Sequence, residues 1–316
     1  MTLDNIVEEI NKANTIAILT HESPDGDAMG SSLAMYNALK DMGKSPDVII
    51  PEYSRIFEFL PGTENILKEP KYDEYDLAIA LDCGDLKRLN GFTNVFEDAK
   101  TTISIDHHSM NPMFADFNYV NPVSPACCQI LVIVLEYLNI KITKEIGTCL
   151  LTGIITDTGG FKYSGVSAET FEFAAWLLNS GVNVSEIYKK VLQIKTRANY
   201  ELSKIAMNKM EFLEDDKITF TYVTLEEQAN VGNEEGAHEG IVEIGRDIEG
   251  VEISIFLREA EDGYKVSLRS NEYINVADVC LMFGGGGHPR AAGCKIQGSP
   301  EQIKIKLVNE IKKELK

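Results

Sequence analysis

Short apolar runs alternate with longer amphipathic segments through the first 180 or so residues of the chain. The apolar runs predict short strands buried on both faces, at 16–19, 47–50, 77–81 and 101–105. Apolar residues at helical spacing predict helices at 27–42, 127–138, 144–156 and 168–179. Alternating strands and helices of this kind are typical of an α/β domain built on a parallel, doubly wound sheet.

The pattern changes in the second half of the chain. A helical pattern rich in Lys and Asn runs from Val184 to about Leu213, and we expect it to carry the chain between two domains. Asp262-Gly263 is a hairpin signal between two strand-like segments. The strands expected here lie at 218–223, 251–257 and 264–268, with helices at 276–283 and from Pro300 to the end.

These patterns predict an α/β protein with two domains. We predict an N-terminal domain with a doubly wound parallel sheet at 1–190, a helical linker at 191–214, and a smaller mixed-sheet α/β domain at 215–316. A length of 316 residues with 44% hydrophobic content is sufficient for two separate cores.

The composition also bears on the compartment and the partners. The six cysteines form no C-x-x-C pair and lie mostly in apolar segments, which favours reduced thiols, and Cys83 fits a small core residue. No apolar run is long enough to span a membrane, so we expect a cytoplasmic protein without a membrane partner. A net charge of −19 argues against coating long nucleic acid, but it allows a short anionic substrate if divalent ions reverse the charge locally.

Acids and imidazoles follow three of the predicted strands. They are His21, Asp25 and Asp27 after the first strand, Asp82 after 77–81, and Asp106, His107 and His108 after 101–105. Ligands of open parallel sheets bind at the carboxyl ends of the strands, so these groups should meet at one edge. Taken alone, Pro24-Asp25-Gly26-Asp27 also fits an ordinary turn that caps a helix, and Asp157 fits either a further carboxylate or a turn residue.

The residue types at this edge indicate metal chemistry. So many acids together are costly without cations, and carboxylates with a minority of imidazoles suit Mn²⁺ or Mg²⁺ better than structural zinc. There are too many carboxylates for one ion, and two bridged ions can generate hydroxide and stabilise the oxygens of a phosphoryl transition state. The pattern therefore predicts hydrolysis of phosphoesters.

The same residues resemble the motifs of the DHH phosphoesterase family, which is named for the run found here at Asp106-His107-His108. The resemblance covers nearly the whole chain in order and spacing. The other matching segments are His21 to Ser31, Leu81 to Asp85, Gly153 to Gly159, and Gly284 to Gly293, the last resembling the signature of the DHH-associated C-terminal domain. One departure is Gly160 before Phe161, where relatives often carry a larger residue.

The resemblance implies a role for each residue of the metal site. One Mn²⁺ would be held by His21, Asp25 and Asp82, and the other by Asp27, Asp82, His107 and Asp157, with Asp82 bridging. Mg²⁺ or another divalent cation would also fit. The resemblance makes Asp82, Asp106 and His108 the catalytic group, with Asp106 orienting His107 and His108 facing the scissile phosphate.

The glycine-rich segment of the second domain suits an anion, because glycines let backbone N–H groups approach it closely. A helix C-cap followed by a tight turn is the structural alternative. The expected substrate-binding residues are Arg269, Ser270, Gly285, Gly286, Gly287, His288 and Arg290, of which Arg269 and His288 are the main phosphate contacts. Arg258 is a weaker candidate, and we expect His238 to be solvated.

Within the family, this compact form is similar to the nanoRNase group of bifunctional oligoribonucleases and 3′-phosphoadenosine 5′-phosphate phosphatases. The resemblance implies an exonuclease whose partners are short RNA or DNA oligonucleotides and nucleotide bisphosphates. RecJ-type exonucleases carry further nucleic-acid-binding domains, and family II pyrophosphatases lack the Gly-Gly-Gly-His signature.

Two alternative functions remain: hydrolysis of linear diadenylate, and a metal-bound nucleotide sensor without turnover. The sequence leaves the polarity of attack open and allows a homodimer.

Overall fold

The computed structural model describes residues 3–89, 91–163, 165–234 and 236–315. The chain divides into two compact units, the first ending at Ile194 and the second beginning at Lys195. Each unit has a hydrophobic core of its own.

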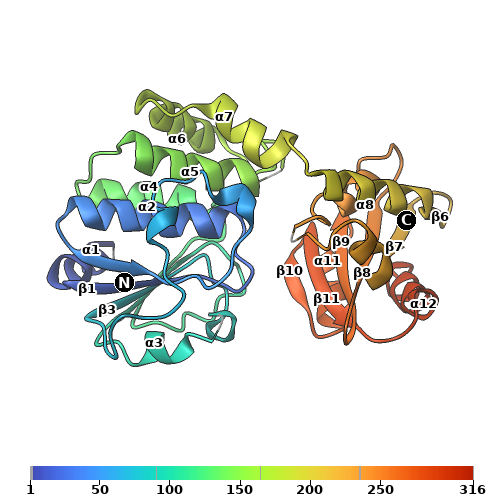
Figure 1. Ribbon diagram of the computed structural model, residues 1–316, viewed down its shortest axis with the longest axis horizontal. Coiled ribbons are helices and arrows are strands. Elements are labelled where there is room, and N and C mark those ends of the chain that lie inside the picture. Colours follow the sequence, from blue (N-terminus) through green and yellow to red (C-terminus); the bar gives the residue numbers. More distant parts are fainter. Residues whose placement is uncertain (1–2, 90, 164, 235, 316) are drawn as a thin grey trace. The chain divides into compact units, whose positions relative to one another are not determined.

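The first unit is built on a five-stranded sheet (Figure 1). Its strands follow the order β2-β1-β3-β4-β5, and all pairs are parallel, which confirms the predicted sheet. The strands are β1 (Thr15–Leu19), β2 (Ser45–Val48), β3 (Leu77–Leu81), β4 (Thr102–Asp106) and β5 (Phe117–Val120). Because the order reverses between β1 and β3, the fold has a switch point at the carboxyl ends of those strands, where ligands of such sheets bind.

Helices cover both faces of this sheet, and most of them lie on one face (Figure 1). The helices are α1 (Leu3–Lys12), α2 (Gly26–Asp41), α3 (Thr93–Glu97), α4 (Cys127–Tyr137), α5 (Lys144–Asp157), α6 (Ala168–Asn179) and α7 (Val184–Tyr188). Short 3-10 turns occur at Arg55–Phe57, Thr63–Asn65 and Leu86–Arg88, and a π-helical turn at Lys189–Gln193. A smaller apolar cluster packs α3 against the opposite face through Phe96.

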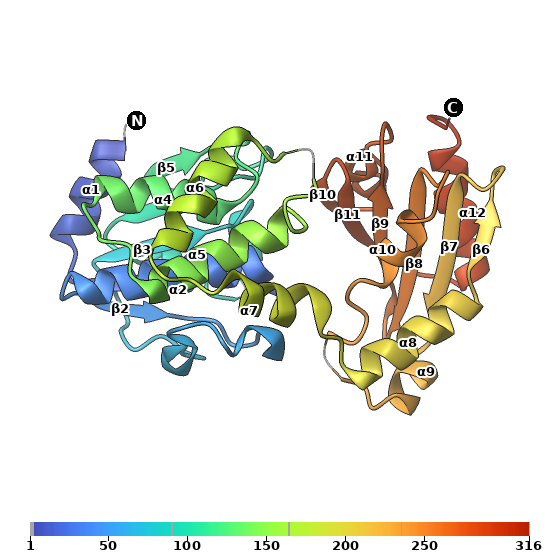
Figure 2. The same cartoon turned by 90° about the horizontal axis from the view of Figure 1, so that it is seen from above.

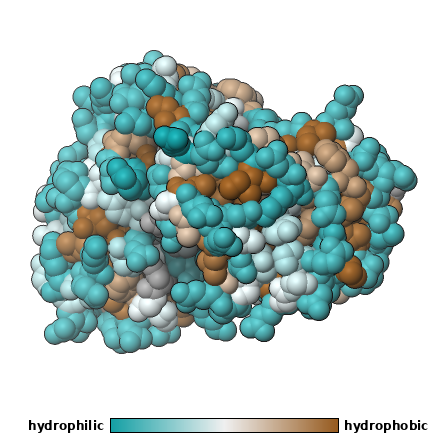
Figure 3. Space-filling view, turned by 45° about the vertical axis from the view of Figure 1, so that its right-hand side comes forward, coloured by the Kyte–Doolittle hydropathy of each residue, from teal (hydrophilic) through white to brown (hydrophobic). Residues whose placement is uncertain are grey.

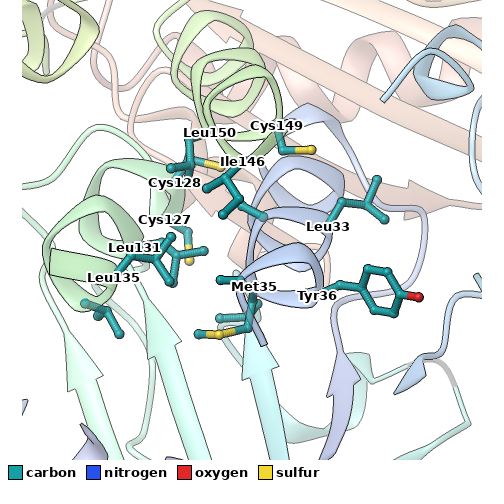
Figure 4. Close-up of a cluster of buried hydrophobic side chains, with 14 of the residues drawn as sticks. Leu33, Met35, Tyr36, Cys127, Cys128, Leu131, Leu135, Ile146, Cys149 and Leu150 are labelled. Carbon is teal, nitrogen blue, oxygen red and sulfur yellow. The ribbon is translucent and has the colours of Figure 1, made fainter. Parts of the chain in front are cut away.

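The main core fills the space between the sheet and helices α2, α4 and α5. Figure 4 shows side chains of these three helices, among them Leu33, Leu131 and Leu150, gathered above the strands. Glycines bring α2 and α5 unusually close together: a methyl group added at Gly30 would lie 2.5 Å from the carbonyl oxygen of Cys149. This close packing sets the distance between the site residues that the two helices carry.

The second unit contains a mixed six-stranded sheet in the order β10-β11-β9-β8-β7-β6 (Figure 2). Only β7 and β8 are parallel to each other, and the hairpin predicted at Asp262-Gly263 is confirmed by the antiparallel β8–β9 pair. The strands are β6 (Glu211–Leu213), β7 (Ile218–Val223), β8 (Ile253–Ala260), β9 (Gly263–Ser270), β10 (Gly286–His288) and β11 (Ala291–Ile296).

Two groups of helices pack on opposite faces of this sheet. Helices α11 (Val276–Leu281) and α12 (Pro300–Ile311) cover the face that carries Ile255 and Leu257. Helices α8 (Arg197–Asn208) and α10 (Ile241–Arg246) pack against Phe256 on the other face, and α9 (Leu225–Asn230) is a further short helix.

Several expectations are corrected by the structure. The long helix predicted from Val184 to Leu213 is wrong: Ile194 has an extended backbone, the Thr196 side chain caps a new helix, and residues 211–213 pair with β7 as a strand. The glycine-rich segment is not only a loop, because it contains β10. Neither α1 nor the edge strand β5 was predicted.

The surface is mainly polar on the face shown in Figure 3, where apolar residues occur in small groups. In the described part of the chain, no helix is both long enough and apolar enough to cross a membrane.

Candidate metal centre

Three adjacent strands of the first unit bring predicted site residues to one edge of the sheet. His21 lies two residues beyond β1, Asp82 follows β3 directly, and Asp106 is the last residue of β4. All three are buried. Asp82 adopts a φ of 52°, a left-handed conformation that few residues other than glycine accept, and such strain is often found at functional sites.

Asp27 reaches the same edge from the first turn of α2. Its carboxylate accepts hydrogen bonds from the backbone N–H groups of Cys127 (2.5 Å) and Cys128 (2.9 Å), at the N-terminus of α4, where a negative charge is favoured. Across from it, a methyl group added at Gly153 of α5 would lie 2.6 Å from Asp27 Oδ1. Asp27 therefore fits only because residue 153 is glycine.

His107 points its Nε2 atom into the acid cluster. That atom lies 3.3 Å from Asp82 Oδ1, 3.3 Å from Asp157 Oδ2 and 3.9 Å from Asp27 Oδ2. The other ring nitrogen, Nδ1, lies 3.2 Å from the carbonyl oxygen of Ser124 and can donate to it. In that tautomer the lone pair of Nε2 faces the carboxylates, which is the arrangement of a metal ligand.

A second group of donors lies on the other side of Asp82. His21 Nε2 is 3.8 Å from Asp82 Oδ2, and His21 Nδ1 is 2.7 Å from the carbonyl oxygen of Glu22. Asp25 caps α2 by accepting from the backbone N–H groups of Asp27 and Ala28. Ligand atoms of His21, Asp25 and Asp82 lie within 4.8 Å of one another, as do those of Asp27, Asp82 and His107. Asp82 thus turns one oxygen toward each set.

The clustered carboxylates at this edge of the sheet favour the binding of a cation. Burial, followed by the charge of Asp82, raises the pKa of Asp27 to about 7, and burial with the charges of Asp27 and Asp25 raises the pKa of Asp157 well above its usual value. Burial opposes ionisation of Asp82, but His107 outweighs it and holds the Asp82 pKa below its ordinary range. The pKa of His107 is raised in turn, because the surrounding acids outweigh the effect of its burial.

One buried oxygen of Asp82 indicates whether these residues suit a metal ion. Among the described residues, Oδ1 of Asp82 receives no hydrogen bond. A buried carboxylate oxygen without a donor is costly unless a cation binds it. Carboxylates and imidazoles are suitable donors for a hard or borderline divalent ion, so these residues fit a metal site.

Asp106 has a different partner from the one expected. Its Oδ1 accepts from Nδ1 of His108 (2.7 Å) and from the backbone N–H of His107 (2.8 Å), while Oδ2 accepts from Asn111 Nδ2 (2.7 Å). The expectation that Asp106 orients the ring of His107 is therefore wrong. It orients His108, because the backbone turn after β4 brings the second ring back over the carboxylate.

Sequence reasoning missed Asn111 and Ser124 as supports of this site. Ser124 acts through its backbone carbonyl, which no side-chain motif reveals, and Asn111 lies in a loop five residues after Asp106, where no periodic pattern places its side chain. Cys83 is buried, as expected of a core residue.

The predicted substrate-binding residues all lie in the second unit. Arg269 on β9 is paired with Glu243 of α10 at 2.8 Å. Arg290 donates to the carbonyl oxygens of Ile274 and Glu272, and the buried Ser270 hydroxyl also donates to Ile274. The last two residues thus stabilise the turn at 271–275, and their contact with substrate stays a prediction.

Comparison with known proteins identifies the family. The DHH family, N-terminal domain, matches residues 15–154, and the DHHA1 domain matches residues 215–316. The chain is 34% identical over 98% of its length to the "Bifunctional oligoribonuclease and PAP phosphatase NrnA" of Thermus thermophilus, of which it covers 94%. The chain belongs to the DHH phosphoesterase family. It is therefore a phosphoester hydrolase, and the resemblance seen in the sequence is confirmed.

Solved structures show the same architecture. An exopolyphosphatase-related protein from Bacteroides fragilis superposes with a TM-score of 0.90 and 29% identity, covering 97% of this chain and 95% of that one. RecJ of Thermus thermophilus in complex with Mn²⁺ superposes with a TM-score of 0.57 at 13% identity, over 96% of this chain and 53% of RecJ. The RecJ likeness concerns the fold alone.

Proposed function

We propose that this DHH phosphoesterase hydrolyses short oligonucleotides to 5′-mononucleotides and 3′-phosphoadenosine 5′-phosphate to AMP, using two Mn²⁺ ions. The main support for the proposal is the position of Asp82, whose Oδ2 atom faces His21 and whose Oδ1 atom faces His107. A carboxylate shared between two donor sets is the feature that two-metal phosphoesterases require.

The proposed ligand sets follow from these contacts. His21, Asp25 and Asp82 would hold one ion, and Asp27, Asp82, His107 and Asp157 the other. When bound, such a pair of ions supplies an activated water and neutralises charge on the phosphoryl oxygens. The choice of Mn²⁺ is supported by the mixture of carboxylates and imidazoles in the two donor sets.

His108 is proposed to act on the substrate instead of on the metals. Its Nδ1 is hydrogen-bonded to the buried carboxylate of Asp106, which fixes the ring orientation. A ring held in this way can polarise a phosphate oxygen or protonate the leaving oxygen through Nε2. Asp106 is then a positioning residue.

The oligonucleotide preference is supported by the NrnA relative, which is named for its oligoribonuclease and PAP phosphatase activities. The proposed substrate contacts are Arg269 and His288, which are both ladder neighbours of Ala291. The other proposed contacts are Gly285, Gly286, Gly287, Ser270 and Arg290. Hydrolysis of linear diadenylate is the main alternative substrate, because it presents the same phosphodiester between two nucleosides. The six free cysteines support an action in the reducing cytoplasm.

A substrate panel tests this proposal. Purified protein would be incubated with Mn²⁺ and, separately, di-, tri- and pentanucleotides, longer single strands, linear diadenylate, 3′-phosphoadenosine 5′-phosphate and pyrophosphate. We expect the highest kcat/KM with the short oligonucleotides and release of 5′-mononucleotides. A preference for long strands or for pyrophosphate would refute the proposed substrate class.

A further inference from the structure

The second unit carries a pair of basic residues that the proposed function has not used. Arg258 on β8 and Lys265 on β9 are partners in the antiparallel ladder, so their side chains lie next to each other on one face of the sheet. Lys265 is exposed and Arg258 is half-buried. The same face carries Ser267 and Arg269, because side chains alternate along a strand.

Arg258 has no acidic partner in the described part of the chain. Among the described residues, its guanidinium group makes no hydrogen bond or ion pair, although burial lowers its pKa. Nearby acids are already engaged: Glu259 accepts from the backbone of Leu225, and Asp262 pairs with Lys295. In a chain with 49 acidic and 30 basic residues, a half-buried arginine left without an acid indicates a place for an external anion.

His238 lies beside this pair, in the loop before α10. It was expected to be solvated, but it is half-buried. Burial, with the charges of Arg258 and Lys265, lowers its pKa to about 4, so the ring is neutral near pH 7. A neutral imidazole next to two cations adds a hydrogen-bonding group without adding repulsion.

On the β8 side of Ser267, its ladder partner Phe256 is covered by α8 and α10, whereas the β11 side carries few side chains. There Ser267 faces Gly293 across the β9–β11 ladder, and Gly293 in turn pairs with Gly286. A methyl group added at Gly286 would meet no atom within 4 Å, so the strand is open at that position. Arg269 lies four residues from Lys265, which is about 13 Å along a strand.

We propose that Arg258 and Lys265 bind a second phosphate group of the same oligonucleotide whose first phosphate is bound near Arg269. This inference rests on the proposed function. The two positions are too far apart for one phosphate to occupy both, so the substrate must continue along β9 to reach the second. The pair thereby favours oligonucleotides longer than a dinucleotide.

The test compares wild type with Arg258→Gln/Lys265→Gln on 5′-phosphorylated RNA of two to five nucleotides. We expect the ratio of kcat/KM for the pentanucleotide to that for the dinucleotide to fall about tenfold, because charge-assisted hydrogen bonds to the distal phosphate are lost. Fluorescence anisotropy of labelled pentanucleotide and dinucleotide on chelator-treated protein should show the same change in relative affinity.

Lys295→Gln is the matched control, because Lys295 is the ladder partner of Lys265 on β11 but is already paired with Asp262. It should keep the wild-type ratio. Thermal melting shows that each variant is folded. An unchanged ratio in the double variant, or equal losses at every length, would overturn the inference. Failure of the wild type to hydrolyse any oligonucleotide would instead refute the proposed function itself.

Discussion

The two units differ in the sign of the charge that their residues neutralise incompletely. In the first unit, His107 lies near three carboxylates, those of Asp27, Asp82 and Asp157, and Oδ1 of Asp82 receives no hydrogen bond from the described residues. In the second unit, Arg258 lies half-buried beside Lys265 and has no acidic partner among the described residues. An unpaired buried charge costs free energy in the absence of a ligand, so each unit indicates by its sign what it binds. The residues of the first unit fit cations, and we propose that the second unit binds anions.

Removing the shared carboxylate should have the largest effect. In Asp82→Asn, the side chain loses the charge that faces both donor sets, and we expect activity to fall at least about a thousandfold because the nucleophile and the charge stabilisation fail together. Metal content by elemental analysis should fall as well. Asp85→Asn is the control, because Asp85 is exposed three residues away. Activity of Asp82→Asn within tenfold of wild type would contradict the two-metal proposal.

Removing the imidazole ring of His108 should slow the reaction without releasing the metal ions. His108→Ala is expected to reduce kcat about a hundredfold while the protein keeps its metal, since the Nδ1 atom of His108 is hydrogen-bonded to Asp106 (2.7 Å) and lies farther, 3.6 Å, from Asp82. Asp106→Asn should add little to His108→Ala in the double variant if Asp106 acts through that ring. A His108→Ala protein without metal would make His108 a ligand.

A change outside the ligand set should weaken the metal site by a smaller factor. In Gly153→Ala the new methyl group would lie 2.3 Å from the sulfur of Cys128 and 2.6 Å from Asp27, so α2 and α5 must separate. We expect about a tenfold higher Mn²⁺ concentration for half-maximal activity. Gly165→Ala is the comparison, because its nearest neighbour would be Pro125 at 3.5 Å. Equal metal dependence in both variants would show that the helix spacing does not control the site.

The smallest effect is expected in the second unit. Arg269→Ala should raise KM for a dinucleotide several-fold, up to about tenfold, with little change in kcat. The reason is that the proposed contact of Arg269 with the substrate phosphate is equally strong in the ground state and in the transition state. The change should be smaller for a small activated phosphodiester. Equal losses on the two substrates would indicate that Arg269 supports the fold through Glu243 instead.

Part of the site was predictable because local patterns encode it. Apolar runs placed the strand at 77–81 where the structure has it, and polar residues directly after such runs must lie at the sheet edge in a parallel fold. The parallel sheet, without its edge strand β5, and the family followed from these patterns and motifs. The location of the acids and imidazoles at adjacent strand ends required no knowledge of distant contacts.

Only the tertiary structure decided which groups meet. The sequence motif places His107 and His108 side by side, but packing turns one ring toward the acid cluster and the other toward Asp106. It also breaks the expected long helix at Ile194 and pairs Arg269 with Glu243, while no described acid pairs with Arg258. Periodicity fixes the faces of helices and strands, whereas side-chain partners depend on contacts between residues far apart along the chain, which local patterns do not encode.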